Sequence, residues 1–101
     1  MNPFSFRVGT VSGSPIFLEG HEYIDELTGS KKTFCEFVLY RLGGKTVRYP
    51  TFPPIKVRNY SSSDPIFERD ETVKVTFADA TDMFRKFAKR QFLGKEFYAV
   101  L

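Results

Sequence analysis

At 101 residues the chain has the length of one small domain, predicted over residues 1–101, and its 42% hydrophobic content is sufficient for a core. No apolar run approaches the ~18 residues that a membrane span needs, and the N-terminal stretch lacks the pattern of a signal peptide, so no membrane association is expected. The net charge of +3 is unevenly spread: residues 31–60 carry seven Lys and Arg against the one acid Glu36, and residues 83–101 are also basic. Segregated charge of this kind favours an anionic partner, with chance clustering on a solvated surface as the alternative.

The first third of the chain is predicted to contain one strand and a loop. Residues 4–10 alternate apolar and polar side chains with period two, which is typical of a half-buried strand. The Ser-Gly-Ser-Pro sequence at 12–15 interrupts this strand, and the short apolar segment 16–19 is interpreted as its continuation after a bend. The acidic segment 20–30, which contains two glycines, is predicted to be a loop or hairpin tip.

The strongest predicted strand covers residues 32–41. Its apolar side chains lie on both faces, which indicates a central position in a sheet. Gly43-Gly44 then predicts a tight turn, so residues 45–50 are expected to pair with this strand in a hairpin. Three prolines in residues 50–54 cannot donate to a ladder, so the partner strand is placed at a sheet edge and is expected to end near residue 50 or to restart at Ile55.

After a polar connection, residues 72–77 are predicted to be a strand whose inward side chains are Val73, Val75 and Phe77. The apolar period then changes to that of a helix, predicted near residues 80–92 with Asp79 or Thr81 as its N-cap. A last strand is expected within residues 95–101. The predicted fold class is therefore all-β with one short helix.

Few side chains of this sequence could perform catalysis. His21 and Cys35 are the single residues of their types, so a Cys–His or Ser–His system would depend on one copy of each, and Cys35 lies in an apolar run that favours a buried thiol. A lone cysteine also excludes an intrachain disulfide, which fits a cytoplasmic protein. The sequence has neither zinc-ligand spacing nor a phosphate-binding glycine motif, so no metal and no cofactor is predicted.

One group of acids suggests a metal-dependent nuclease: Asp64, Glu68, Asp70 and Glu71, beside Lys74. On a strand, however, Glu71 and Lys74 would point to opposite faces, so a solvated acidic loop is the preferred interpretation. The chain is therefore predicted not to be an enzyme.

Nucleic-acid binding fits the basic segment better than catalysis. Single strands are held by cations along the phosphates and by aromatic faces on which bases stack, and both kinds of side chain occur together in residues 31–60. The predicted nucleic-acid-binding residues are Arg41, Lys45, Arg48, Tyr49, Phe52, Lys56, Arg58 and Tyr60. Auxiliary phosphate contacts are predicted for Lys31, Lys32, Arg85, Lys86, Lys89 and Arg90. Duplex recognition is not favoured, because the predicted helix is short and has no evident base-reading face.

These assignments have structural alternatives. Phe34 and Val47 are expected in the core rather than on a binding surface. The alternation places Tyr49 on the same face as Val47 and Arg48 on the other, but which face is buried is left open. Charge and proline on an edge strand also deter aggregation, which would explain the basic residues of this segment without a ligand, although not its aromatic residues. The helix bases suit an ordinary solvent face.

The order of these segments resembles that of OB-fold single-stranded DNA-binding proteins, in the small single-domain form found in bacteriophages. The matching pieces are RVGTVSGSP (7–15), TFCEFVLYR (33–41), KTVRYPTF (45–52) and ETVKVTF (71–77). One departure is the helix. An OB barrel usually places its helix between the third and fourth strands, whereas here the helix is expected between the last two.

The resemblance implies a small five-stranded OB-like barrel and largely sequence-independent binding of single-stranded DNA in replication or packaging. It also implies a viral, phage-encoded protein in the host cytoplasm that forms homo-oligomers, with dimers favoured. Two alternatives use the same features. One is a protein-interaction or structural accessory module of viral origin, in which exposed rings bury in a partner. The other is an RNA-binding module, since the 2′-hydroxyl is what separates the two nucleic acids.

Overall fold

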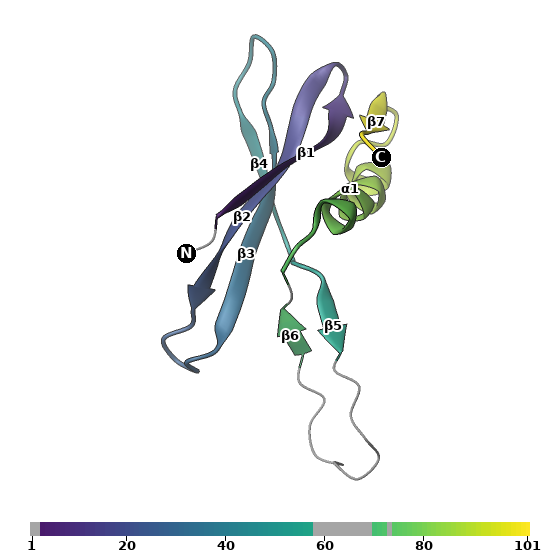
Figure 1. Ribbon diagram of the computed structural model, residues 1–101. Helices are drawn as coiled ribbons and strands as arrows, with labels where there is room; N and C mark the ends of the chain where they lie inside the picture. Colours follow the sequence, from purple (N-terminus) through teal and green to yellow (C-terminus); the bar gives the residue numbers. More distant parts are fainter. Residues whose placement is uncertain (1–2, 58–69, 73) are drawn as a thin grey trace.

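The structure is a computed structural model that describes residues 3–57, 70–72 and 74–101. Its main element is a five-stranded antiparallel sheet with the strand order β4-β3-β2-β1-β7 (Figure 1). The strands of this sheet are β1 (Phe4–Val11), β2 (Ser14–Ile24), β3 (Lys31–Leu39), β4 (Val47–Thr51) and β7 (Phe97–Ala99). The other elements are the strand pair β5 (Ile55–Val57) and β6 (Asp70–Thr72) and the helix α1 (Phe77–Gln91).

The strands and the single helix of the described residues confirm the prediction of a mostly β fold with one helix. β3 lies between β2 and β4, as its two apolar faces indicated, and it pairs with β4 from Cys35↔Thr51 to Leu39↔Val47. β4 is an outermost strand of the five, as the prolines indicated. The sheet is open, with β4 and β7 at its two ends, whereas the resemblance implied a closed barrel.

β2 is a separate strand and is longer than predicted. Ser12 and Gly13 both have positive φ (49° and 82°) and form a tight turn, so β2 reverses direction and pairs antiparallel with β1 instead of continuing it. The strand then runs to Ile24, through a segment predicted to be a loop. Gly20 lies inside this strand, where the neighbouring backbone leaves no room for a side chain. A Cβ at this position would lie 2.1 Å from the carbonyl oxygen of Phe34, so glycine is the residue that fits here.

The strand predicted for residues 72–77 is wrong beyond Thr72, where β6 ends. Residues 74–76 belong to no strand, and the helix already begins at Phe77. Val75 is buried, as predicted, whereas Phe77 is 41% exposed, and Val73 lies outside the described residues. The last strand is present as β7, antiparallel to β1.

The helix starts earlier than the sequence predicted because Thr76 forms its N-cap. The Thr76 hydroxyl accepts a hydrogen bond from the Asp79 amide at 3.1 Å, and the Asp79 carboxylate accepts one from the Thr76 amide at 3.2 Å. This reciprocal capping box satisfies two amides that the first turn leaves without helical partners. The predicted caps are therefore wrong: Asp79 is the third helical residue, and Thr81 lies inside the helix, where its hydroxyl donates to the Phe77 carbonyl.

Removing the cap should have a measurable cost. We expect Thr76→Ala to lower the free energy of unfolding by about 1 kcal/mol, because the Asp79 amide loses its acceptor. Urea denaturation followed by circular dichroism measures this. Thr46→Ala, at an exposed position before β4, is the matched control and should change stability by less than about 0.5 kcal/mol. Equal losses in the two variants would contradict the capping assignment.

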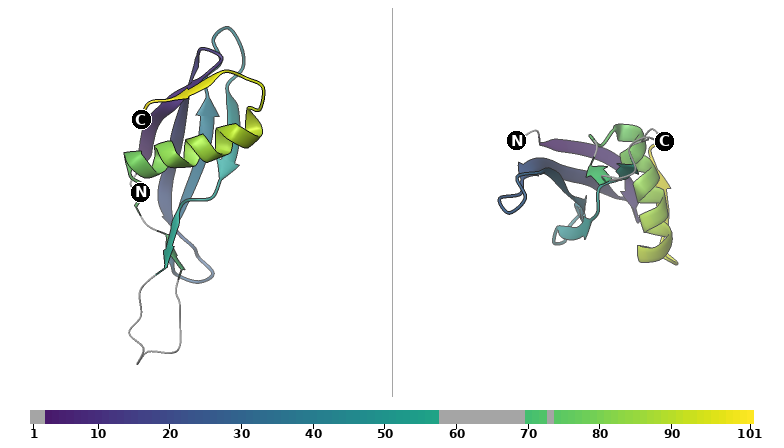
Figure 2. Two further views of the ribbon diagram at one scale, coloured as in Figure 1. Left: turned by 90° about the vertical axis from the view of Figure 1, so that its right-hand side faces the viewer. Right: turned by 90° about the horizontal axis from the view of Figure 1, so that it is seen from below.

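α1 packs across one face of the sheet and covers the core (Figure 2). Phe37, in the middle of β3, is fully buried, and its ring centroid lies 4.6 Å from that of Phe87 and 6.1 Å from that of Phe84. Leu18 and Cys35 are buried on the same side. Burial raises the pKa of the Cys35 thiol to about 11, which agrees with the predicted buried cysteine. Within the described residues, no helix covers the opposite face (Figure 1).

Candidate nucleic-acid interface

The sheet face that points away from α1 carries Arg48 and Lys32 of the predicted binding residues, together with further aromatic and charged side chains, and we call it the open face. Its members follow from the strand registers, in which Arg7, Phe17, Val38 and Arg48 are neighbours across four strands. Alternation along each strand then assigns the rest. The open face consists of Ser5, Arg7, Phe17, Glu19, His21, Tyr23, Lys32, Phe34, Glu36, Val38, Tyr40, Arg48 and Pro50.

A row of aromatic rings lies on the open face along β2 and β3. His21 and Phe34 are paired across the two strands, with ring centroids 5.6 Å apart, and Tyr23 follows at 6.2 Å from His21. Phe34 and Tyr23 are each 39% exposed. Half-exposed rings that neighbouring strands hold in place are suited to stacking against planar ligands, because their position is fixed while one side stays accessible.

Two carboxylates lie beside this row. Glu19 and Glu36 are direct neighbours on β2 and β3. The Tyr40 hydroxyl donates to the Glu19 carboxylate, which raises the pKa of Tyr40, and the Arg48 guanidinium pairs with Glu36, which raises the pKa of Arg48. Like charges on facing residues repel, so these two partners make the arrangement possible. The Glu36 side chain is only 14% exposed, whereas that of Arg48 is 56% exposed.

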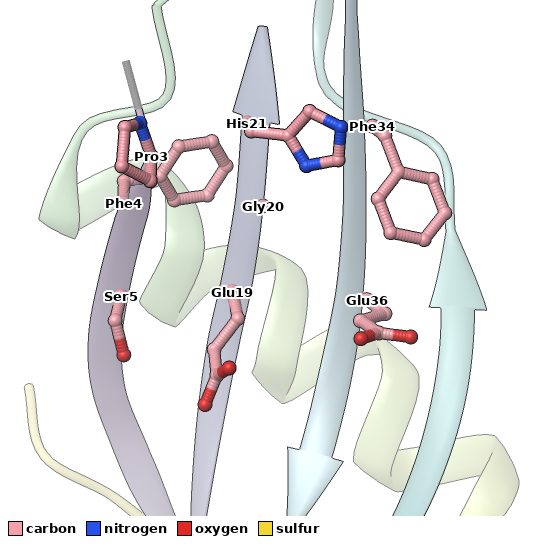
Figure 3. A pocket seen from close by; sticks show the side chains of 8 residues that line it. All are labelled: Pro3, Phe4, Ser5, Glu19, Gly20, His21, Phe34 and Glu36. Atoms are coloured by element: carbon pink, nitrogen blue, oxygen red, sulfur yellow. The ribbon is translucent and has the colours of Figure 1, made fainter. Parts of the chain in front are cut away.

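The rings and carboxylates enclose a shallow depression of about 680 Å³ on the open face (Figure 3). Glu19, Gly20 and His21 of β2 lie in its middle. Side chains of β3 form one wall and the start of β1 forms the other (Figure 3). The full lining is Pro3, Phe4, Ser5, Glu19, Gly20, His21, Phe34 and Glu36.

Three of the predicted basic residues gather near the β4 end of the sheet. Arg41 and Lys45 are exposed in the connection between β3 and β4, and Arg48 lies on β4 itself. Phe52 follows directly after β4 and is 89% exposed. The β4 edge therefore offers cations before and along the strand and one exposed ring after it, next to the open face.

The other predicted binding residues are dispersed. Tyr49 is on the face opposite to Arg48, where its ring packs edge-on against Phe87 at 5.4 Å and Phe92 at 5.6 Å. It is half-buried in the core, so its ring does not share a surface with Arg48. Lys56 belongs to β5, and Arg58 and Tyr60 lie outside the described residues.

The auxiliary basic residues lie at the start of β3, where Lys32 belongs to the open face, and on α1. Lys31 and Lys32 begin β3 and pair with Glu22 at 3.0 Å and Asp25 at 2.8 Å, and the second pair lowers the pKa of Asp25. The helix bases lie on α1, in the layer that covers the core, away from the open face (Figure 2). They are Arg85, Lys86, Lys89 and Arg90, of which Lys86 pairs with Asp82 at 3.2 Å.

Several residues of the open face were not assigned to a site by sequence reasoning. Phe34, expected in the core, is partly exposed, and Glu19, His21 and Tyr23 were placed in or before a loop. The sequence carries only a weak signal for them: apolar and polar side chains do not alternate from Phe17 to Tyr23, although the rings Phe17, His21 and Tyr23 fall at even-numbered spacing.

Comparison with protein-family models, with curated proteins and with solved structures gives no match to this chain. None of the helices among the described residues is long and apolar enough to cross a membrane. Across residues 3–57, 70–72 and 74–101, no three His, Cys, Asp or Glu side chains form a group that could hold a metal ion.

Proposed function

We propose that the protein binds single-stranded DNA without catalysis, through the open face and the basic connection between β3 and β4. The observation that carries this proposal is the row of half-exposed rings, His21, Phe34 and Tyr23, on a sheet face that no described helix covers. Bases stack on such rings with little regard to sequence, at about 1–3 kcal/mol per base.

The cations near β4 supply the second element of the interface. Arg41 and Lys45 are exposed, and Arg48 keeps more than half of its side chain accessible while it pairs with Glu36. Phosphates of a strand lying on the rings would come within reach of these side chains at the sheet end. Contacts of this type add affinity that falls with salt concentration.

The biological setting that we propose follows the sequence resemblance. It comprises binding with little sequence preference in DNA replication or packaging, a viral origin, the cytoplasm as location, and assembly into homo-oligomers such as dimers. An OB-like architecture belongs to the same proposal. The antiparallel order of β1 to β4 supports it, whereas the open sheet order does not.

A fluorescence titration with oligo-dT of about nine nucleotides, at low and high salt, tests the proposal. We expect Phe34→Leu to weaken binding by about 1–3 kcal/mol with an unchanged salt dependence, because it removes a stacking face and no charge. Lys45→Gln should lower the slope of log affinity against log salt by about one. Lys86→Gln, on the helix layer, is the charge-matched control and should leave both quantities unchanged. Absence of binding at low salt, or equal effects of the two lysine variants, would refute the proposal.

Two other functions use the same exposed rings. A protein partner could bury them, and a pull-down with and without nuclease separates this from nucleic-acid binding. RNA could stack on them as DNA does, and competition between DNA and RNA oligonucleotides of matched sequence decides, because the 2′-hydroxyl is the group that separates the two nucleic acids.

A further inference from the structure

We infer that the depression on the open face is a base pocket that prefers guanine, an inference that rests on the proposed binding of single-stranded DNA. The depression combines two features that a merely sequence-tolerant surface does not need. It has a ring pair, His21 and Phe34, and directly beside it a carboxylate pair, Glu19 and Glu36 (Figure 3).

The placement of these two pairs suits one base. On each strand the ring and the carboxylate are two residues apart and on the same face, which corresponds to about 6.6–6.8 Å along a strand. A base lying on the ring pair therefore directs one edge at the carboxylate pair. The start of β1, with Ser5 opposite Glu19, limits the pocket on the other side (Figure 3).

The chemistry of the carboxylates selects the edge. An ionised carboxylate only accepts hydrogen bonds, and it accepts best from two parallel N–H groups, as it does from arginine. The Watson–Crick edge of guanine presents two such neighbouring donors, N1–H and the 2-amino group. Thymine presents one N–H between two carbonyl oxygens, and adenine and cytosine each place an amino group beside an acceptor nitrogen. Guanine is therefore the base whose edge complements this pocket.

Glu19 is the residue that we assign to base reading. Its carboxylate accepts one bond from Tyr40, and a carboxylate has about four acceptor sites, so capacity for a ligand remains. The Tyr40 bond also orients the group. Glu36, whose side chain is 14% exposed, is engaged by Arg48, which offsets its charge and reduces repulsion of the DNA phosphates. Charge and hydrogen bonding at the pocket are thus compatible with an anionic strand.

The test compares oligo-dT strands of about nine nucleotides that carry one central dT, dG, dA or deoxyinosine. Deoxyinosine is guanine's analogue without the 2-amino group. With the unaltered protein we expect dG to increase affinity about tenfold over dT, as one charge-assisted hydrogen-bond pair would, and deoxyinosine to lose most of this gain.

Glu19→Gln should abolish the dG preference without weakening the binding of oligo-dT, because it removes a bidentate acceptor together with a negative charge. If Glu19 had only a structural role, Glu19→Gln would weaken the binding of oligo-dT and of the dG-containing oligonucleotide alike. Asp82→Asn, an acid on α1, is the control and should keep the preference. Binding of oligo-dT without any dG preference, or a preference that survives in Glu19→Gln, overturns the inference and leaves the proposed function intact. Absence of binding to every strand overturns both.

Discussion

Replacing Phe37 by alanine is expected to lower the free energy of unfolding by about 3–5 kcal/mol. Phe37 lies in the middle of β3 and is completely buried. Its ring stacks on that of Phe87, with 4.6 Å between the ring centroids. Its removal leaves a cavity between the sheet and α1 that the two layers cannot close without moving toward each other and disturbing the surrounding packing. A loss of this size is a large part of the ~5–15 kcal/mol that stabilises a typical domain.

Phe52→Ala is the matched control, because it removes the same side chain from a position that is 89% exposed. It should change the free energy of unfolding by less than about 0.5 kcal/mol. Urea denaturation of both variants gives the comparison. Similar losses for Phe37→Ala and Phe52→Ala would mean that the packing of α1 on this face of the sheet is wrong.

The second large effect is expected for Gly9→Ala, where β1 meets β7. A Cβ at this position would lie 2.1 Å from the carbonyl oxygen of Tyr98 and 2.7 Å from the Phe84 ring, both well inside contact distance. β7 has only three residue pairs with β1, so we expect the added methyl group to displace β7 rather than the core. We expect a loss of about 1–3 kcal/mol or more, together with faster hydrogen exchange of the Val100 amide, which donates to the Val8 carbonyl at 2.9 Å.

Gly44→Ala serves as control for this substitution. Its Cβ would come no closer than 3.4 Å to the Arg41 side chain, and its φ lies outside the positive region. Stability should therefore change by less than about 0.5 kcal/mol. If Gly9→Ala is as mild as Gly44→Ala, or if Val100 exchange is unaffected, β7 does not pair with β1 in the register described.

Local sequence signals predicted the elements whose geometry is decided locally. The pairing of β3 with β4 follows from alternation on both sides of Gly43-Gly44, and the edge position of β4 follows from its prolines. The tight turn predicted at Gly43-Gly44 is wrong, because the connection covers residues 40–46 and only Gly43 of the two has a positive φ. The same alternation separated Tyr49 from Arg48 correctly. It could not decide which of the two faces the core, because that depends on where α1 packs, far along the chain.

Non-local contacts explain the predictions that were wrong. A glycine such as Gly20 is expected to weaken or end a strand. Here the nearby backbone of β3 requires a residue without a side chain, so the strand continues through it. The continuation of β2 to Ile24 was missed for this reason, and with it the ring row that includes His21 and Tyr23. The early start of α1 had a local signal, the Thr-x-x-Asp capping box, which competed with the strand-like alternation of the residues before it.

The layered arrangement gives the two faces of the sheet different tasks. α1 covers one face, so the large rings there, such as Phe37 and Phe84, stabilise the fold. The other face keeps its rings half-exposed and adds charged groups whose partners are already fixed, such as Glu36 with Arg48. Variants of the open face should therefore affect ligand binding more than folding, and variants of the helix-covered face the reverse.

Nuclear magnetic resonance of the isotope-labelled protein during titration with oligo-dT at low salt tests the proposed interface most directly. If single strands stack on the open face, the ring protons of His21, Tyr23 and Phe34 shift upfield and show contacts to base protons, while the resonances of α1 change little. Shifts concentrated on α1 (Phe77–Gln91), or unchanged ring resonances at saturating oligonucleotide, would contradict the open face as the binding surface.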